Sequence, residues 1–237
     1  MTASIIIPVY NAEHTLQAAL ESALRQKFPG TEFEVIVVND GSTDHTAAIL
    51  ESYKQEIRIF TQKNSGALKA SNAGFRAAQG KYVIKLDADD RFEPPLLQEM
   101  TAAKERHPDV TFVYCDYYEK NVATGEVKVV SAENIFSTVG GGILFCRDAF
   151  AREGFFREDI KFAEYDLLLR TKDKWKGCYV PKPLFWYNRR IGSLTSSAQW
   201  LKEAFRELYQ IHPDKHAEIK QIRGYEITRT NNDLFSS

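Results

Sequence analysis

Four short apolar runs, each ending in polar turn residues, constrain the fold of this 237-residue chain more than any other feature. Their apolar, β-branched character is typical of strands buried on both faces. Stretches with apolar residues at helical spacing separate them, and a strand–helix–strand series places consecutive strands side by side and parallel. The sequence therefore predicts an α/β fold with a mostly parallel sheet and helices on both faces. The four runs lie at residues 4–9, 33–38, 57–61 and 82–86.

Polar side chains follow each of these predicted strands. Asn11 follows the first, Asp40 the second and Asn64 the third, while Asp87-Ala88-Asp89-Asp90 follows the fourth. Ligands of open α/β sheets bind beyond the carboxyl ends of the strands. We therefore expect these side chains to meet at one edge of the sheet.

The acidic cluster places three carboxylates within four residues. Asp87 and Asp89 lie two apart and can project the same way from the strand end, while Asp90 starts the following turn. Like charges this close need compensation, and Mg²⁺ or Mn²⁺ sites use one or two carboxylates together with substrate phosphates. A solvated acidic turn or a helix cap would use the same residues, so the cluster alone leaves both interpretations open.

Composition and charge exclude several classes of protein. A net charge of -1 gives no reason to expect nucleic acid as a partner. The three cysteines, Cys115, Cys146 and Cys178, are widely spaced and form no CxxC pair, which fits a reducing compartment and argues against a zinc site. The short apolar run at residues 4–9 lacks the length and basic flank of a signal peptide, and no apolar stretch has the length that spans a bilayer, so we expect neither element. We expect a cytoplasmic protein.

The second half of the sequence is less regular, and it contains no internal repeat. Gly140-Gly141-Gly142 precedes a predicted strand rather than a helix, so we expect a close backbone approach or a hinge there instead of a phosphate-binding loop. Two further strands are predicted at residues 178–180 and 184–187, the first stopped by Pro181. An amphipathic helix over residues 198–211 has Trp200, Leu201, Phe205 and Leu208 on one side, which predicts a core-packing stripe.

Four motifs in order resemble those of family-2 glycosyltransferases, over about residues 4–193 and most strongly before Glu93. They are Ser4-Ile5-Ile6-Ile7-Pro8-Val9-Tyr10-Asn11, Val37-Val38-Asn39-Asp40-Gly41-Ser42-Thr43-Asp44, Asn64-Ser65-Gly66 with Asn72-Ala73-Gly74, and Asp87-Ala88-Asp89-Asp90. The resemblance implies the Rossmann-like GT-A fold with a C-terminal helical extension, a nucleotide-sugar donor, Mn²⁺ or Mg²⁺, and inversion at the anomeric carbon. It also implies a single domain over 1–237, with a nucleotide-sugar half (1–93), an acceptor and catalytic half (94–197) and the extension (198–237).

The resemblance also implies roles for individual residues. Asp89 is the expected metal ligand, and Asp87 contacts the ribose or shares the metal. Asp40 matches the aspartate that binds the nucleotide base, although an Asx-turn or a helix cap would also explain it. The remaining residues expected to contact the donor are Pro8, Tyr10, Asn11, Glu13, Asn64, Gly66, Lys69, Asn72, Ala88 and Arg190.

Two positions depart from the family pattern. Ser71 stands where an arginine is common, with Lys69 as a nearby basic residue. Arg190 stands near the place of a histidine that sometimes binds metal, and a guanidinium at Arg189 or Arg190 suits diphosphate oxygens instead.

An inverting transfer needs a general base to take the proton of the acceptor hydroxyl. The resemblance places Glu164 at that position, in Phe162-Ala163-Glu164-Tyr165-Asp166-Leu167, where relatives have an aspartate. Asp166 is the alternative base. Acidic residues also favour the first turn of a helix without any catalytic role.

The sequence thus predicts a glycosyltransferase that moves a sugar from a UDP-sugar to a glycan or lipid-linked acceptor in polysaccharide or cell-envelope synthesis, with peripheral membrane association compatible with that role. A nucleotidyltransferase is disfavoured because Pro8-Val9-Tyr10-Asn11 replaces a glycine-rich loop, and Ala88-Asp89-Asp90 does not supply the DxDxT-like run of a haloacid-dehalogenase-type phosphatase. A binding protein of the same fold without turnover stays open. The donor sugar, the acceptor and the oligomeric state are not determined by the sequence.

Overall fold

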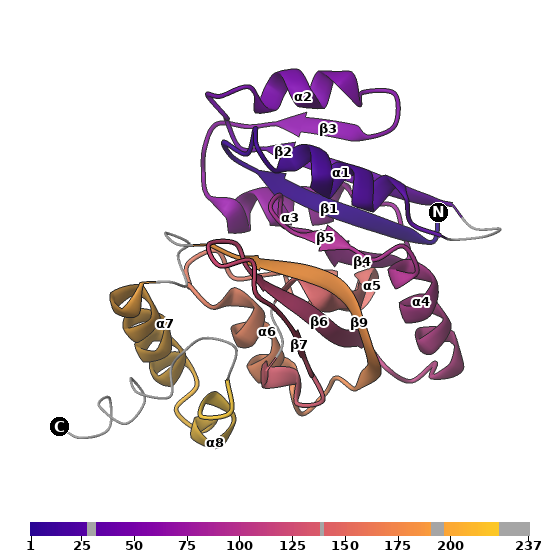
Figure 1. The fold of residues 1–237 in the computed structure, drawn as a ribbon. Helices are drawn as coiled ribbons and strands as arrows, with labels where there is room; N and C mark the ends of the chain where they lie inside the picture. Colours follow the sequence, from indigo (N-terminus) through magenta and orange to yellow (C-terminus); the bar gives the residue numbers. More distant parts are fainter. Residues whose placement is uncertain (28–31, 138–139, 191–196, 223–237) are drawn as a thin grey trace.

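The computed structural model describes residues 1–27, 32–137, 140–190 and 197–222. In that part of the chain one nine-stranded sheet has helices on both faces (Figure 1). The strands are β1 (Ala3–Val9), β2 (Phe33–Asn39), β3 (Arg58–Thr61), β4 (Tyr82–Lys85), β5 (Arg91–Phe92), β6 (Phe112–Asn121), β7 (Val127–Val130), β8 (Ile143–Cys146) and β9 (Gly177–Arg189). The helices are α1 (Leu16–Leu24), α2 (Thr46–Ser52), α3 (Ala67–Ala77), α4 (Leu96–Arg106), α5 (Arg147–Arg152), α6 (Ala163–Thr171), α7 (Ala198–Ile211) and α8 (His216–Ile219), with 3-10 turns at Ile135–Ser137 and Gly140–Gly142.

The strand order is β3-β2-β1-β4-β8-β6-β9-β5, with β7 paired to β6. Strands β3, β2, β1 and β4 run parallel to one another, as the sequence predicts. Strand β8 lies antiparallel between β4 and β6, and β9 runs parallel to β6, so the whole sheet is mixed. The predicted α/β fold is confirmed, and the carboxyl ends of β1, β2 and β4 share one edge.

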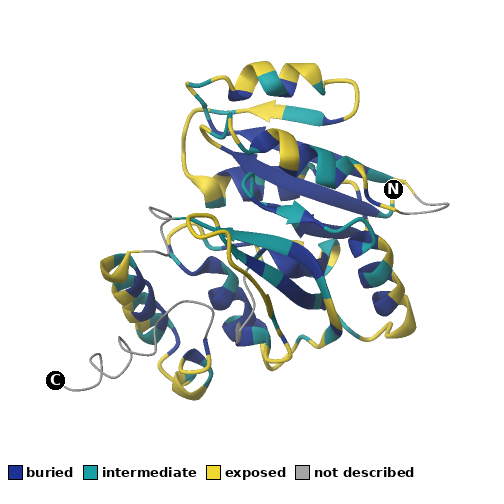
Figure 2. Ribbon diagram, in the orientation of Figure 1, coloured by how far each residue is buried: buried dark blue, intermediate teal, exposed yellow. Residues whose placement is uncertain are grey.

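Successive residues of β1 face opposite sides of the sheet, so the strand belongs to two hydrophobic cores. Ile5 and Ile7 pack in the core covered by α1 and α4, while Ile6 packs in the core covered by α3, α6 and α7. All three are fully buried, and Figure 2 shows the central strands as the most buried part of the molecule. Burying each such side chain contributes about 1.5–3 kcal/mol, which fixes the strand ends that position the site.

The two strands predicted at 178–180 and 184–187 are one strand, β9, so the predicted break at Pro181 is wrong. Pro181 and Pro183 are tolerated because β5 pairs only with Phe185 and Trp186, which leaves the other edge of β9 open at the prolines. The register between β6 and β9 shifts beside Asp116, where an irregularity absorbs the misfit.

The predicted C-terminal helical extension consists of α7 and α8, and residues 223–237 lie outside the described part. On α7, Leu201, Phe205 and Leu208 are buried in the second core, as predicted. Trp200, predicted in the same stripe, is only partly buried.

Candidate active site

A cavity of about 510 Å³ lies beyond the carboxyl end of β4 and beside the first turn of α6. Side chains from both halves of the chain line this cavity. It lies at the edge of the sheet where ligands of open α/β folds bind. The lining residues are Ser65, Gly66, Ala67, Leu68, Lys69, Lys85, Asp87, Asp89, Asp90, Gly140, Gly141, Glu158, Ile160, Lys161, Phe162, Glu164, Tyr187 and Trp200.

The acidic cluster follows β4, and all three carboxylates line this cavity. Burial and the neighbouring charge of Asp87 raise the pKa of Asp89, while the nearby Arg190 guanidinium opposes that rise. Asp90 is almost fully buried, and its Oδ1 accepts a hydrogen bond from the backbone N–H of Asn188 at 2.8 Å. Burial and then the charges of Asp87 and Asp89 raise the pKa of Asp90 well above its usual value. The cluster therefore concentrates more negative charge than its surroundings neutralise.

These carboxylates fit a hard divalent cation that takes its remaining ligands from a substrate. Asp87 and Asp89 offer oxygen ligands at the cavity surface, and a cation would relieve the repulsion that raises the pKa of Asp89. In the described part of the chain, no three side chains of the types His, Cys, Asp and Glu converge on one metal position. A metal here would thus depend on donor oxygens as well as on Asp87 and Asp89.

Lys85, which the sequence reasoning missed, connects the acidic cluster to Glu164. Its Nζ lies 2.9 Å from Glu164 Oε1 and 3.3 Å from Asp87 Oδ1. Burial opposes the charge of both Lys85 and Glu164, but their attraction prevails: the pKa of Lys85 is raised and that of Glu164 is lowered. Glu164 is therefore an ionised carboxylate facing the cavity. A lysine inside the apolar strand, two residues before Asp87 and hence on its face, was the available sequence signal.

The three glycines lie between Glu164 and the acidic cluster. A Cβ on Gly140 would lie 2.5 Å from Glu164 Oε1, and one on Gly142 would clash with the ring of Phe185. A Cβ on Gly141 would reach 4.0 Å from Asp90 Oδ2. The predicted close backbone approach is confirmed, and its partners are the Glu164 carboxylate and the Phe185 ring.

A smaller cavity of about 160 Å³ adjoins the first and shares Gly66 and Ala67 with it. Four of the predicted donor-binding residues, Pro8, Tyr10, Asp40 and Asn64, line it together with Gly66. The buried Asp40 carboxylate accepts hydrogen bonds from Gln62 Nε2 at 2.8 Å and from the backbone N–H groups of Ser65 at 2.9 Å and Gly66 at 2.8 Å. Asp40 thus shapes the loop between both cavities.

Neither an Asx-turn nor a helix cap explains Asp40. Asn39 Oδ1 accepts the backbone N–H of Ser42 at 2.9 Å, and Asp44 Oδ1 accepts that of Thr46 at 3.0 Å, at the start of α2. The side chains of Asn39 and Asp44 thus make the local turn bonds of this motif, whereas the Asp40 carboxylate bonds to the segment 62–66 beside the cavity.

Asn11 and Glu13 line neither cavity, unlike the other predicted donor contacts of this loop. Asn11 has a positive φ of 48°, and its Oδ1 accepts the backbone N–H of Thr43 at 2.8 Å. Glu13 accepts the backbone N–H of His45 at 2.9 Å, and this bond and the His45 side chain lower the pKa of Glu13. Both side chains join the loop after β1 to the loop after β2.

Asn72 and Ala88 also lie away from the cavities. The Asn72 amide is buried, and its Nδ2 donates to the carbonyl of Phe156 at 2.8 Å and to Glu158 Oε1 at 2.9 Å. Ala88 packs against the first core. Ser71 Oγ donates to the carbonyl of Ala67 at 2.7 Å within α3, so its side chain faces its own helix.

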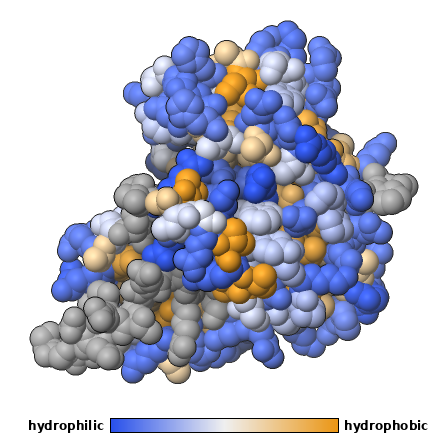
Figure 3. All heavy atoms as spheres, viewed as in Figure 1, coloured by the Kyte–Doolittle hydropathy of each residue, from blue (hydrophilic) through white to orange (hydrophobic). Residues whose placement is uncertain are grey.

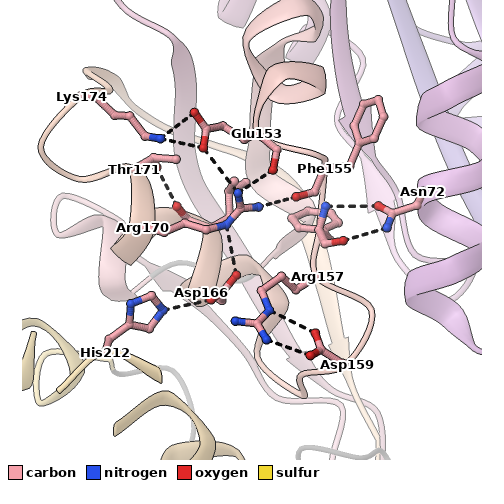
Figure 4. Close-up of polar contacts among 12 residues, drawn as sticks. Asn72, Glu153, Phe155, Arg157, Asp159, Asp166, Arg170, Thr171, Lys174 and His212 are labelled. Atoms are coloured by element: carbon pink, nitrogen blue, oxygen red, sulfur yellow. Dashed lines mark hydrogen bonds and ion pairs between the residues drawn. The ribbon is translucent and has the colours of Figure 1, made fainter. Parts of the chain in front are cut away.

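Asp166 is not placed to act as the alternative base. It is fully buried, with Oδ1 2.9 Å from His212 Nε2 and Oδ2 3.1 Å from Arg170 Nε (Figure 4). Asp166 lies two residues after Glu164 on α6, and a helix turns by about 200° over two residues. The Asp166 side chain therefore points away from the cavity. Its contacts join α6 to the end of α7 instead.

The two predicted basic contacts lie on either side of the acidic cluster. Lys69 lines the larger cavity from α3, and its side chain is exposed. Arg190 Nε lies 3.6 Å from Asp89 Oδ2, at the end of the described segment 140–190.

Residues 4–156, which include the strands and loops of this sheet edge, match the family model described as Glycosyl transferase family 2. The chain belongs to this family, as its motifs predicted.

Among its relatives is the poly(ribitol-phosphate) beta-N-acetylglucosaminyltransferase TarS of Staphylococcus aureus, 37% identical over 229 residues that cover 89% of this chain and 40% of TarS. An uncharacterized glycosyltransferase of Rickettsia typhi is 31% identical over 94% of this chain and 73% of its own length. The chain thus spans less than half the length of TarS.

Two solved structures show the same fold. The structure of S. aureus TarS 1-349 in complex with UDP has a TM-score of 0.71 at 24% identity, covering 97% of this chain and 74% of that chain. The mannosyltransferase PcManGT from Pyrobaculum calidifontis, in complex with GDP-Man and Mn²⁺, has a TM-score of 0.70 at 17% identity, covering 92% and 68%. Within the described residues, no helix is long and apolar enough to cross a bilayer.

Proposed function

We propose that this chain is an inverting glycosyltransferase that moves a sugar from a UDP-sugar to an acceptor hydroxyl. The observation that supports it most is the shared cavity, in which Glu164 and the carboxylates after β4 lie on the two sides of Lys85. Such a transfer needs two separate groups. One is an acidic cluster that can bind a cation beside the leaving group, and the other is an ionised carboxylate that takes the proton of the acceptor.

The nucleoside of the donor would occupy the smaller cavity, against Tyr10 and Asp40. Its diphosphate would then reach the larger cavity past Gly66, where Lys69 and Arg190 supply positive charge. UDP is the first candidate nucleotide because TarS, a relative with the same fold, has been solved with UDP and with UDP-GlcNAc.

Asp87 and Asp89 would hold Mn²⁺ or Mg²⁺ together with the diphosphate oxygens. Such a cation stabilises the negative charge that develops on the leaving nucleoside diphosphate. The buried Asp90 contributes differently, since its hydrogen bond to Asn188 N joins the end of β9 to the acidic turn.

Glu164 would act as the general base. The acceptor oxygen attacks the anomeric carbon while the bond from that carbon to the diphosphate breaks, and the acceptor proton passes to the Glu164 carboxylate. Lys85 keeps Glu164 ionised before the transfer, and Gly140 leaves the space that the carboxylate occupies.

The acceptor and the setting follow by analogy. TarS is named for a poly(ribitol-phosphate) acceptor, and a Bacillus subtilis relative, 28% identical over 84% of this chain and 50% of its own length, is named a minor teichoic acid biosynthesis protein. We therefore place this chain in cell-envelope glycan synthesis, acting from the cytoplasmic side. The single-domain division, with a donor half to residue 93 and an acceptor half after it, is part of the same proposal.

The test is UDP-GlcNAc turnover with Mn²⁺, comparing the wild type with Asp89→Ala and Glu164→Gln. We expect UDP release to fall in both variants, and UDP binding by calorimetry to fall only in Asp89→Ala. Wild-type UDP binding without any turnover would support a binding protein, while release of pyrophosphate from UTP and a sugar phosphate would support a nucleotidyltransferase. Full transfer by Glu164→Gln would overturn the base assignment.

A further inference from the structure

The cavity has two chemically different walls. Lys85, Glu164 and the carboxylates after β4 form its charged side. The other side is apolar and consists of Leu68, Ile160, Phe162 and Trp200. A diphosphate belongs on the charged side, which leaves the apolar wall for a part of a substrate that is not ionised.

Trp200 is held in this wall by contacts that lie outside the segment matching the family model. Its ring packs edge-to-face on Phe162, with centroids 5.3 Å apart, and Phe162 packs in turn on Phe205 of α7, also at 5.3 Å. Its backbone N–H donates to Ser197 Oγ at 3.3 Å at the start of α7. The far end of α7 is fixed to α6 through His212 and Asp166. The indole is therefore in a defined position although α7 follows Glu164 by more than thirty residues.

The indole N–H of Trp200 is also available to donate a hydrogen bond to a ligand. Within the described part of the chain, the ring N–H of Trp200 has no hydrogen-bond acceptor, whereas that of Trp186 donates to Glu93 Oε1 at 2.5 Å. An aromatic ring with a free donor suits a ligand that has an apolar face and hydroxyl groups at its rim.

The charged residues beside this wall are largely neutralised. Lys161 pairs with Glu207 and Glu203, and Glu158 accepts from Asn72 and pairs with Arg76. The third charged residue here, Lys69, forms no ion pair among the described residues. A chain of repeated phosphodiesters needs several cations, and this wall does not supply them.

We propose that the acceptor presents a cyclic sugar, whose apolar face stacks on Trp200 and whose hydroxyl points to Glu164. This proposal rests on the proposed function and narrows its acceptor: a pyranoside ring fits the wall, while the acyclic polyol phosphate in the name of TarS does not. Trp200 is then a residue that determines acceptor specificity.

Tryptophan fluorescence of the full chain, saturated with UDP and Mn²⁺, tests the proposal. The probes are methyl N-acetyl-β-D-glucosaminide and methyl β-D-glucopyranoside as cyclic acceptors, and D-ribitol 5-phosphate as the acyclic one, each to roughly 50 mM, which is ample for a millimolar site. We expect at least one glycoside to quench the fluorescence of the wild type and of Trp186→Phe, the control that removes a tryptophan elsewhere. Trp200→Ala should lose the quench, and ribitol 5-phosphate should cause none.

Quenching by ribitol 5-phosphate alone, no quenching by either glycoside, or equal quenching in Trp200→Ala would each overturn the proposal. Transfer assays with the glycosides give a second measurement: Trp200→Ala should raise KM for the acceptor about tenfold or more while UDP affinity stays unchanged. Trp200→Phe, which keeps the packing on Phe162, should recover part of that loss. UDP binding in the same samples separates the two proposals, because its absence would refute the proposed function, whereas its presence without glycoside binding refutes only the acceptor.

Discussion

Replacing Lys85 by methionine removes the cation that neutralises Glu164 and keeps a side chain of similar length. The two groups are 2.9 Å apart, with side-chain exposures of 11% for Lys85 and 20% for Glu164. At an effective dielectric constant of about 20, charges at this distance attract by about 6 kcal/mol before the cost of desolvation. In the variant, burial still disfavours the carboxylate, and only a hydrogen bond from the Glu164 backbone remains to favour its ionised form.

The expected shift follows from that balance. An opposite charge at contact distance favours the ionised carboxylate, so the pKa of Glu164 should rise when Lys85 is replaced by methionine. Removing one partner of a buried ion pair leaves the other charge uncompensated, which predicts a loss of about 3–5 kcal/mol in the free energy of unfolding near neutral pH.

The sign of the pH dependence is fixed by the same pair. Glu164 has a lowered pKa in the folded chain, so its contribution is present above the unfolded value and lost as the pH falls through the folded one. Lys85 has a raised pKa, so its contribution is complete below its unfolded value and lost only as the pH rises through the folded one. The pair therefore stabilises the fold from about pH 5 to about pH 10. The difference between wild type and variant should shrink on acidification, as Glu164 of the variant takes up a proton.

Urea unfolding from pH 3 to 9 measures the stability, and the pH profile of kcat/KM measures the base. We expect the acid limb of that profile to move to higher pH in Lys85→Met. Lys128→Met is the matched control, because Lys128 lies at the same 2.9 Å from Glu119 but is 57% exposed and should contribute at most about 1 kcal/mol. A stability loss that is independent of pH, or an unmoved acid limb, would refute the coupling of Lys85 to Glu164.

Three further predictions concern the cavity and its supports. Asp89→Asn should abolish Mn²⁺-dependent tightening of UDP binding, measured by calorimetry, and reduce UDP release about 100-fold or more. Gly140→Ala should lower kcat with little change in UDP affinity, because its Cβ would lie 2.5 Å from Glu164 Oε1; an unchanged kcat would contradict the geometry. His212→Ala should cost about 1–3 kcal/mol in urea unfolding because it leaves Asp166 Oδ1 buried without its partner, and the smaller loss expected in His212→Ala/Asp166→Asn would identify that cause.

Much of the donor half was predictable because its strands and turns are specified by residues only a few positions apart in the sequence. Runs such as residues 4–9 are strands in any context that buries both faces, and parallel strands must bring their carboxyl ends to one edge. That is why Asp40, Asn64 and the carboxylates after β4 were correctly expected at one edge of the sheet, where they line two adjoining cavities. The pattern could not distinguish a residue at the edge from one in the cavity, so Asn11 and Glu13 were expected beside the donor but join two loops.

The tertiary structure decided what depends on segments far apart in the sequence. The sequence leaves both Glu164 and Asp166 as candidates for the base, and only the docking of α6 turns one to Lys85 and the other to His212. Trp200 and Leu201 likewise belong to one apolar stripe, but the position of α7 buries Leu201 and leaves Trp200 at the cavity. By itself the sequence determined the sheet, its edge and the acidic cluster, because periodicity and turn residues act over a few positions. Which carboxylate faces the acceptor and which aromatic ring lines its site depend on packing between distant segments, and that packing exists only in the folded chain.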